Sequence, residues 1–382
     1  MKYLSFIISL ILITNSCSES KPVDYGEILL NDLIIPWEIE IGPDEELWFT
    51  HQFRKLSKLN LTNQKVTSIE IIDTIIPSPN KNYSFGMTFH PDFKNTPWVY
   101  LSFLYQKEND PTTGLLSVKI YEYDAKKNTV TYKKTILKDV GQIGNWNAGG
   151  RIKTSKNYLF VNASNETVLH VPFKDSNLSG SILRYDLDGS IPQDNPIANS
   201  PKYTSGHRNP QGLVVLSDTE IYTSEHGPST DDEFNKIESG KNYGWPMVHG
   251  YCDTERETAY CDTLKSTFPI KSWTPTIAVS SLDFYKGNNE DFKNTFWVTT
   301  LKEGDLRMLR IKDNKLIEEK IFLNEKYGRL RDLTIDKEGN IYISTANNVP
   351  SENQGYPKPN KDESIQYDVI VKFTPDMIDI TM

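Results

Sequence analysis

The sequence predicts an all-β protein, a six-bladed β-propeller with four-stranded antiparallel blades. Two observations carry this prediction. One motif recurs six times, and it consists of an alternating apolar strand, a polar turn and an aromatic-rich strand. The 382-residue chain also has a globular composition, with 37% hydrophobic and 24% charged residues. A β-sandwich or two small β domains would explain the strands but not the repetition.

Each copy of the motif reads as a pair of short strands with period-2 alternation, and almost no amphipathic helix is evident. The copies begin at Trp37, Gly86, Gly150, Gly212, Ser281 and Arg331. The widest interval lies between the fourth and fifth copies. Long inserts in a propeller usually lie on the functional face, so we expect this interval to contribute to a site.

The N-terminus reads as an export signal. Lys2 supplies a positive charge, residues 4–13 are apolar apart from two serines, and small residues lead to Cys17. This apolar run is too short to cross a bilayer as a helix, and its ending resembles a bacterial lipoprotein signal, with Cys17 as the lipidated residue. Thr14 stands where such signals usually carry Leu. A plain secretory signal is therefore the alternative.

The expected organisation is a signal peptide over residues 1–17, a tether over residues 18–30 and the propeller over residues 31–382. No later segment is apolar enough to span a membrane, so the only expected membrane contact is the lipid anchor. The protein is then exported and held on the periplasmic or cell-surface side of a bacterial membrane.

Charge and cysteine content argue against two classes of function, nucleic-acid binding and zinc binding. The formal net charge of -9 and the pI near 5.3 argue against a nucleic-acid partner, which would need a concentrated cationic face. In an exported chain, Cys252 and Cys261 favour a local disulfide over two free thiols. Two thiols alone are too few ligands for zinc.

Chemistry-bearing residues concentrate in and after the fourth copy. The segments are 206–212 (GHRNPQG), 225–228 (EHGP), 231–233 (DDE) and 240–246 (GKNYGWP). Their order and spacing resemble the glucose and sorbosone dehydrogenase family, whose members are six-bladed propellers and include soluble sugar dehydrogenases dependent on pyrroloquinoline quinone (PQQ). Weaker resemblance runs from about Pro36 to about Phe373.

The resemblance implies PQQ as cofactor and a sugar or other alcohol as substrate. A quinone with three carboxylates requires several convergent cations, and arginine forks suit carboxylates best. The family register places Arg208 at the cofactor, where it also polarises the reacting oxygen. The other positions that match the family's cofactor contacts are Asn209, Lys302, Arg329 and Arg331.

Calcium is implied in the same way. The backbone carbonyls of Gly227 and Pro228 match the family's ligands for a cofactor-bridging calcium ion. A second, structural calcium site is implied at Glu233, Tyr243, Tyr251 and Asp253, and a solvated acidic loop is the alternative there.

Two positions depart from the family pattern. The general-base His of the sugar dehydrogenases corresponds to Asn147, four residues before Arg151. A carboxamide cannot accept a proton at neutral pH, and general-base catalysis contributes about 10²- to 10⁴-fold in rate. His226 is the candidate substitute base. Lys81 replaces a Gln near the cofactor and adds a cation beside an anionic ligand.

Three functions therefore stay open. The first is an active PQQ-dependent sugar dehydrogenase. The second is a catalytically silent propeller that still binds a quinone, calcium or carbohydrate, as the loss of the family His would suggest. The third is a calcium-dependent hydrolase of lactones, since other six-bladed propellers do that work. The electron acceptor cannot be read from the residues.

Overall fold

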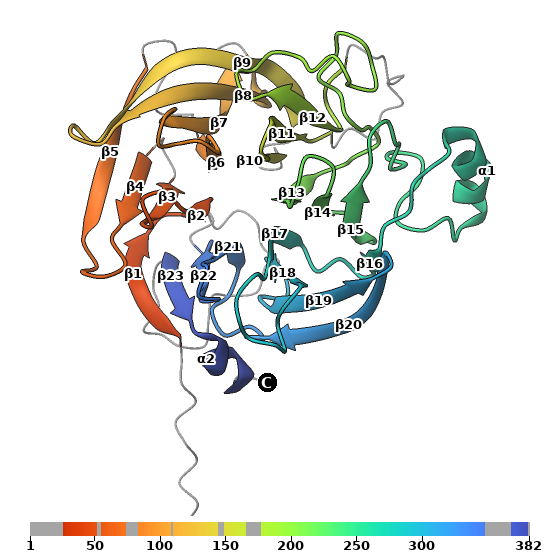
Figure 1. The fold of residues 1–382 in the computed structure, drawn as a ribbon. Helices are drawn as coiled ribbons and strands as arrows, with labels where there is room; N and C mark the ends of the chain where they lie inside the picture. Colours follow the sequence, from red (N-terminus) through yellow and green to blue (C-terminus); the bar gives the residue numbers. More distant parts are fainter. Residues whose placement is uncertain are drawn as a thin grey trace, which may run out of the picture.

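A computed structural model describes residues 26–51, 55–73, 83–107, 110–143, 149–165, 177–347 and 368–380. These residues form antiparallel sheets set side by side in a ring, with one strand of each sheet nearest the centre (Figure 1). No helix among them is long and apolar enough to cross a membrane. Asn147, Lys81 and Cys17 lie outside the described residues.

The first sheet contains eight strands in the order β2-β3-β4-β5-β9-β8-β7-β6. It divides into two antiparallel halves, because β5 and β9 pair in parallel over only a few residues around Glu70 and Thr129. The strands are β2 (Ile39–Ile41), β3 (Leu47–His51), β4 (Lys55–Leu59), β5 (Val66–Ile72), β6 (Tyr83–Phe89), β7 (Trp98–Lys107), β8 (Asp110–Asp124) and β9 (Thr129–Ile143).

Three further sheets follow in chain order, with three, four and four strands. Their strands are β10 (Gly149–Thr154), β11 (Tyr158–Ala163) and β12 (Ser181–Asp186); β13 (Pro210–Val215), β14 (Ile221–Glu225), β15 (Asp232–Ile237) and β16 (Lys271–Trp273); and β17 (Val279–Phe284), β18 (Thr295–Thr300), β19 (Leu306–Lys312) and β20 (Lys315–Phe322). In each sheet the earliest strand lies innermost (Figure 1).

The last sheet closes the ring with strands from both ends of the chain. Its order is β1-β23-β22-β21, and it comprises β1 (Glu27–Leu33), β21 (Leu330–Ile335), β22 (Ile341–Thr345) and β23 (Asp368–Phe373). Residues 27–30, assigned to the tether from the sequence, belong to this sheet because Glu27 and Ile28 pair with Lys372 and Val371. Closure of this kind removes an exposed edge strand.

The expected repeat corresponds to consecutive strand pairs. Each of the six sequence copies coincides with the two innermost strands of one antiparallel unit: β2 and β3, β6 and β7, β10 and β11, β13 and β14, β17 and β18, and β21 and β22. Apolar side chains from neighbouring sheets form the core between them, with Trp48 and Trp297 fully buried.

The third unit departs from the four-stranded expectation. β12 has only a single bridge, from Leu183 to Lys202, where a fourth strand would pair. The intervening segment contains Pro192, Pro196 and Pro201. Proline has no backbone N–H to donate, so this segment cannot sustain a ladder of hydrogen bonds.

Two short helices complete the fold, α1 (Glu255–Leu264) and α2 (Pro375–Ile380). α1 projects from the ring in the long insert between β15 and β16 (Figure 1). It begins with a capping box, in which the Thr254 side chain accepts from the Glu257 backbone and Glu257 bonds back to Thr254. The sequence pattern did not reveal it because its exposed residues are mostly polar.

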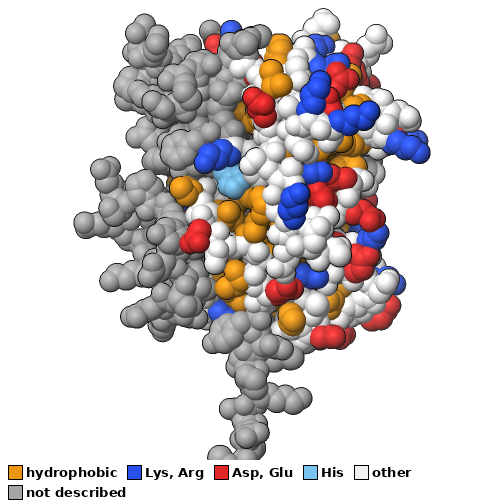
Figure 2. Space-filling model, turned by 90° about the vertical axis from the view of Figure 1, so that its left-hand side faces the viewer, with side chains coloured by type: hydrophobic (Ala, Val, Ile, Leu, Met, Phe, Trp, Pro, Cys, Tyr) orange, Lys and Arg blue, Asp and Glu red, His pale blue; other side chains and the backbone are white. Residues whose placement is uncertain are grey.

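On the face drawn in Figure 2, cationic and acidic side chains are interspersed. The absence of a nucleic-acid partner stays a prediction from the net charge.

Candidate active site

The residues assigned to cofactor binding gather where innermost strands begin. Arg208 and Asn209 directly precede β13, Arg329 precedes β21, and Arg331 is the second residue of β21. Lys302 joins them because its backbone N–H donates to the carbonyl of Ile277, just before β17. We call Arg208, Asn209, Lys302, Arg329 and Arg331 the cationic cluster.

Arg208 is held by the loop that follows β14. Its Nη1 donates to the carbonyl of His226 over 3.1 Å, and its backbone N–H donates to the Glu225 carboxylate. The guanidinium lies 5.3 Å from the ring centre of Trp245. Such a stacked guanidinium is fixed in plane and keeps its charge.

Glu225 supports the whole turn. Besides Arg208, it accepts the backbone N–H of Asn209 over 3.3 Å and pairs with His207 Nδ1 over 2.9 Å. His207 is fully buried and its other ring nitrogen lies 2.9 Å from the Thr204 hydroxyl. This His therefore has a structural role in the turn, as most of the histidines were expected to have.

Arg329 and Lys302 are anchored through backbone carbonyls. Arg329 donates to Leu301 and Ala346, each over 3.2 Å, and Lys302 Nζ donates to Thr276 over 2.7 Å. Neutral carbonyls orient these cations without cancelling their charge. The cluster therefore presents a positive potential at the mouth of the ring.

Arg331 is the least compensated cation. Its Nε is buried and makes no hydrogen bond within the described residues, and its Nη1 has only contacts of 3.4 Å with Gln211 and Ser280. Burial, with the charges of Arg329 and Arg151, lowers the pKa of Arg331 to about 9. An anionic ligand would relieve this cost, because an opposite charge favours the protonated form.

Two further buried ring nitrogens lie near the cluster. Nε1 of Trp245 and Nε2 of His226 have no hydrogen-bond partner in the described part of the chain. Burial lowers the pKa of His226, and the charges of Arg208 and Arg331 lower it further, while Asp232 opposes them. His226 is therefore a neutral imidazole at pH 7, able to accept a proton.

The loop after His226 carries the implied calcium ligands. A Cβ added to Gly227 would collide with the carbonyl oxygens of Thr230 and Asp231, so the tight turn requires glycine. The carbonyl oxygens of Gly227 and Pro228 accept no hydrogen bond from any described residue. Unused carbonyl oxygens in a turn are suitable ligands for a hard cation.

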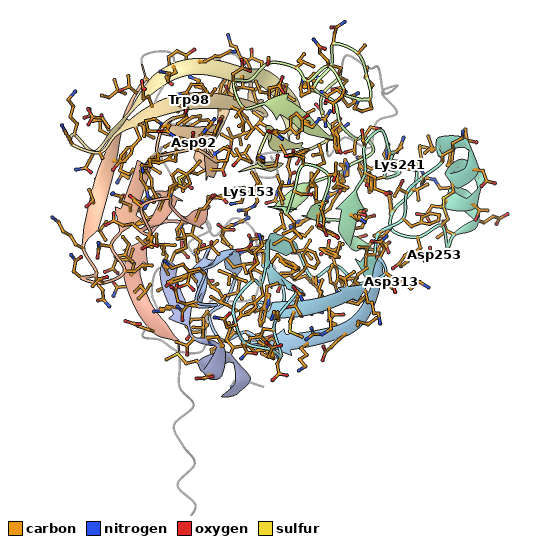
Figure 3. The ribbon with its side chains drawn as sticks, viewed as in Figure 1. Asp92, Trp98, Lys153, Lys241, Asp253 and Asp313 are labelled. Carbon is orange, nitrogen blue, oxygen red and sulfur yellow. A yellow bond between two sulfur atoms is a disulfide. The ribbon has the colours of Figure 1, made fainter. Side chains whose placement is uncertain are left out.

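The structure brings together only some of the four residues predicted to hold the second calcium ion. Glu233 and Tyr243 line one small pocket, whereas the exposed Tyr251 contacts the carbonyl of Ile270 through its hydroxyl and Asp253 is exposed near α1 (Figure 3). Burial and the charge of Glu225 raise the pKa of Glu233 to about 8. No group of three or more His, Cys, Asp or Glu side chains placed to hold a metal occurs within the described ranges. This assignment stays a prediction.

Cys252 and Cys261 are joined as a disulfide, with Cα atoms 6.5 Å apart. This separation lies within the usual range for a disulfide. The bond ties the loop that carries Asp253 to helix α1, which contains Cys261.

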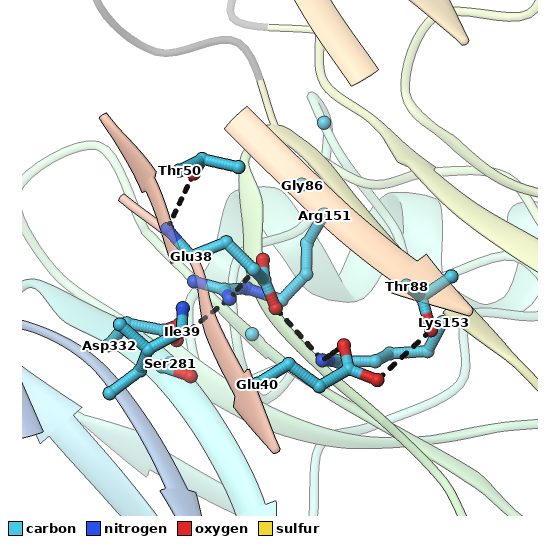
Figure 4. A network of polar contacts seen from close by, with 12 residues as sticks. Glu38, Ile39, Glu40, Thr50, Gly86, Thr88, Arg151, Lys153, Ser281 and Asp332 are labelled. Atoms are coloured by element: carbon cyan, nitrogen blue, oxygen red, sulfur yellow. Dashed lines mark hydrogen bonds and ion pairs between the residues drawn. The ribbon is translucent and has the colours of Figure 1, made fainter. Parts of the chain in front are cut away.

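A buried ion network fills the ring below the cationic cluster (Figure 4). Arg151 donates from Nη1 to Glu38 over 2.6 Å and to Asp332 over 2.8 Å, while Lys153 bonds Glu38 and Glu40 over 2.8 and 2.7 Å. This network was not anticipated from the sequence, because its members come from β10, β21 and the start of β2. We call it the axial network.

Trp37 connects the axial network to the cationic cluster. Its ring lies 4.6 Å from the guanidinium of Arg151 and 6.0 Å from that of Arg331. Sequence analysis had identified Trp37 only as the start of the first repeat. Its position one residue before Glu38 was the available signal.

A cavity of about 490 Å³ lies beyond the axial network, at the far ends of the innermost strands. Its charged lining residues are Glu40, Lys153, Asp283, Lys286, Asp336 and Lys337. Figure 3 shows Lys153 near the centre of the ring. Ile335 lines this cavity, and four residues of β21 at roughly 3.3 Å each place it about 13 Å from Arg331.

Comparison with known proteins identifies the family. The model of the family described as glucose / sorbosone dehydrogenase matches residues 33–351. The chain belongs to this family. Among curated relatives, quinoprotein glucose dehydrogenase B of Acinetobacter calcoaceticus is 27% identical over 415 residues, covering 85% of this chain and 86% of that protein.

Solved structures show that the family fold is shared. The PQQ-bound aldose sugar dehydrogenase of Streptomyces coelicolor has a TM-score of 0.71 at 23% identity, covering 91% of this chain and 96% of its own. The apo-form of the soluble aldose sugar dehydrogenase of Escherichia coli has a TM-score of 0.75 at 22% identity, covering 92% and 99%.

Proposed function

We propose that this member of the glucose/sorbosone dehydrogenase family is a PQQ-dependent sugar dehydrogenase. The observation that carries the proposal is the partly buried Arg331 of the cationic cluster, whose Nε, like Nε1 of Trp245, has no hydrogen-bond partner among the described residues. A planar tricarboxylate quinone offers acceptors to both donors and negative charge to the cluster. The named relative of Acinetobacter calcoaceticus supports the same cofactor.

We further propose that the fold is a six-bladed β-propeller. Dividing the eight-stranded sheet at its short parallel contact gives six antiparallel units, in agreement with the six sequence copies. The cationic cluster then lies at the mouth of the central axis, where residues from several units converge.

In this proposal each residue has a defined task. Arg208, Arg329, Arg331 and Lys302 bind the carboxylates and carbonyls, and Asn209 orients the ligand. PQQ, when bound, supplies the oxidant for an alcohol. Arg208 polarises the reacting oxygen, and Lys81 adds a further cation. Calcium would be held by the carbonyls of Gly227 and Pro228, with a second ion near Glu233.

The family pattern does not assign a general base in this chain, because Asn147 replaces the usual His. Oxidation of an alcohol to a carbonyl releases the hydroxyl proton, and Asn147 cannot accept it. Nε2 of His226 is buried, has no hydrogen-bond partner among the described residues, and belongs to a ring with a lowered pKa. We therefore propose His226 as the proton acceptor. If it does not serve, Asn147 favours the second candidate function, a propeller that binds PQQ without turnover.

The test is a titration of the calcium-loaded apoprotein with PQQ, followed by dye-linked oxidation of a panel of aldoses. Asn147→His and His226→Gln are assayed in parallel. Wild-type turnover that falls about 10²-fold or more in His226→Gln supports the dehydrogenase and its base. Turnover in Asn147→His alone identifies a silent binder, and absence of PQQ binding in every variant rejects the cofactor.

Export and anchoring remain part of the proposal. We propose that the signal peptide is cleaved before Cys17 and that Cys17, as the first mature residue, carries the lipid, so that the propeller acts at a bacterial membrane outside the cytoplasm. Metabolic labelling with a fatty acid analogue tests this, because Cys17→Ala should lose the label and enter the soluble fraction.

A further inference from the structure

The side chain of Gln211 bridges two members of the cationic cluster. Its Nε2 donates to Oδ1 of Asn209 over 2.8 Å, and its Oε1 lies 3.4 Å from Nη1 of Arg331. Gln211 is the second residue of β13 and is 5% exposed. Its backbone carbonyl also accepts from Nε of Arg151 over 2.6 Å. This one residue thus links the cluster to the axial network.

The bridge fixes which way the Asn209 amide points. Oδ1 of Asn209 receives Nε2 of Gln211 and also the Ser164 hydroxyl, which donates over 2.9 Å. The bond from Gln211 defines the amide orientation, because exchanging oxygen and nitrogen in Asn209 would set donor against donor there; the Ser164 hydroxyl can donate or accept and fits the same orientation. The Asn209 amide nitrogen is therefore turned away from Gln211 and Ser164.

The same glutamine restrains Arg331. The guanidinium has only the weak contacts with Gln211 and Ser280, and its Nε has no partner among the described residues. A carboxamide can donate to Asn209 with one end and accept from Arg331 with the other. A hydrocarbon side chain can do neither, and a carboxylate can do only the second while cancelling the charge of Arg331.

We propose that Gln211 is a positioning residue for the PQQ-binding cluster: it orients the Asn209 amide and the Arg331 guanidinium toward a bound tricarboxylate without neutralising the cation. This inference rests on the proposed function, since it concerns affinity for the same cofactor. It adds to that function the residue that sets the geometry of two cofactor contacts.

The experiment compares three variants of the full chain with wild type. Gln211→Glu removes the donor and places a negative charge beside Arg331; Gln211→Met removes both contacts at similar length; Ser164→Ala removes only the second donor to Asn209. Gln64→Glu is the matched control, because Gln64 is exposed and bonds Glu27 on the outer strands. PQQ affinity is measured by fluorescence titration in the presence of calcium, and folding by urea denaturation.

The expected order of PQQ affinity is wild type, then Ser164→Ala, then Gln211→Met, then Gln211→Glu. Loss of one net hydrogen bond weakens binding by about tenfold, and Gln211→Glu should exceed this because it also offsets a charge. Ser164→Ala should change affinity by less than about fivefold, since Gln211 still orients the amide. In folded Gln211→Met and Gln211→Glu, the loss of PQQ affinity should exceed what any fall in the free energy of unfolding accounts for.

The outcomes separate this inference from the proposed function. Wild-type binding with unchanged affinity in folded Gln211→Glu and Gln211→Met overturns the positioning role and leaves the cofactor assignment intact. Affinity that falls only in proportion to a lower free energy of unfolding also overturns it, because the role would then be structural. If wild type itself binds no PQQ, the proposed function and this inference fall together.

Discussion

The two ends of the central axis differ in whether their cations are paired with carboxylates. At the starts of the innermost strands, Arg331 and Lys302 form no ion pair with any carboxylate of the described residues. At the other end, Lys153 bonds two carboxylates and Lys337 bonds Glu45. Of these four cations, only Lys153 and Lys337 are paired with carboxylates of the described residues.

This difference indicates what each end is for. A cation that the chain leaves uncompensated costs stability in the apoprotein and gains favourable energy when an anion binds. A cation already paired with a carboxylate gains little free energy from a bound anion, so it contributes to the stability of the fold instead. The axial network, to which Lys153 belongs, pairs both of its cations with carboxylates, and Arg151 lies between two acidic residues, Glu38 and Asp332.

The largest expected effect is on stability and comes from Arg151→Met. The side chains of Arg151, Glu38 and Asp332 are each 1% exposed, so the variant leaves two buried carboxylates without their main cation. We expect the free energy of unfolding to fall by about 3–5 kcal/mol. Urea denaturation of the apoprotein measures it.

Arg310→Met is the control for Arg151→Met. Arg310 pairs with Glu318 on outer strands, and their side chains are 28% and 35% exposed. An exposed pair contributes about 0–1 kcal/mol. Equal losses in the two variants would show that the axial network has no special role. If Arg151→Met does not fold, Asp332→Asn tests the same network with a smaller change.

The second prediction concerns the two ends directly. Arg331→Met should weaken PQQ binding by about 10- to 100-fold, the loss of charge-assisted contacts, while the free energy of unfolding of the apoprotein rises by about 1 kcal/mol. Lys153→Met should do the reverse, lowering that free energy by about 1–3 kcal/mol and leaving PQQ affinity within about twofold. Parallel effects of the two variants on both measurements would contradict the contrast between the ends.

The third prediction is a pH dependence of the axial network. Burial raises the pKa of Glu38 from the ordinary value of 4.5 to about 7; Arg151 and Lys153 oppose the rise, and Asp332 and Glu40 add to it. The folded state therefore binds more protons than the unfolded state between these pH values. The contribution of Glu38 to stability is fully present below about pH 4.5 and is lost as the pH rises through about 7.

Glu38→Gln isolates this effect. The wild-type free energy of unfolding should fall relative to that of the variant by about 1–3 kcal/mol between pH 4.5 and pH 7.5, because the variant has no proton to lose at this position. Urea denaturation at both pH values gives the difference. A wild-type advantage that instead grows with pH would reverse the sign and show that Arg151 and Lys153 dominate Glu38.

The repeat pattern predicted the fold well because it is local. A strand pair with its turn needs only about twelve residues, so all six copies could be located from the sequence. The three-stranded unit was missed because the effect of Pro192, Pro196 and Pro201 depends on which neighbour each residue would have paired with. Likewise, β1 was read as tether, since its partner β23 lies at the other end of the chain.

The site was predictable only where a motif carried it. Arg208 and Asn209 were singled out because they lie in a dense motif; Gln211 links Asn209 to Arg331, and the cofactor roles of these residues stay predictions. Gln211 belongs to that same motif, yet its role depends on Arg331, 120 residues away. Glu38 and Asp332 were missed for the same reason: each is an ordinary strand residue until the ring closes around Arg151.

The smallest expected effect is at the rim of the far cavity. Lys337 bonds Glu45, but their side chains are 69% and 75% exposed, so water and salt already screen both charges. We expect Lys337→Ala to change neither the urea midpoint nor PQQ affinity beyond experimental error. A clear loss of stability would mean that exposed ion pairs at this end stabilise the fold as the partly buried pairs of Lys153 do. The two ends would then differ in overall charge balance rather than in the burial of their ion pairs.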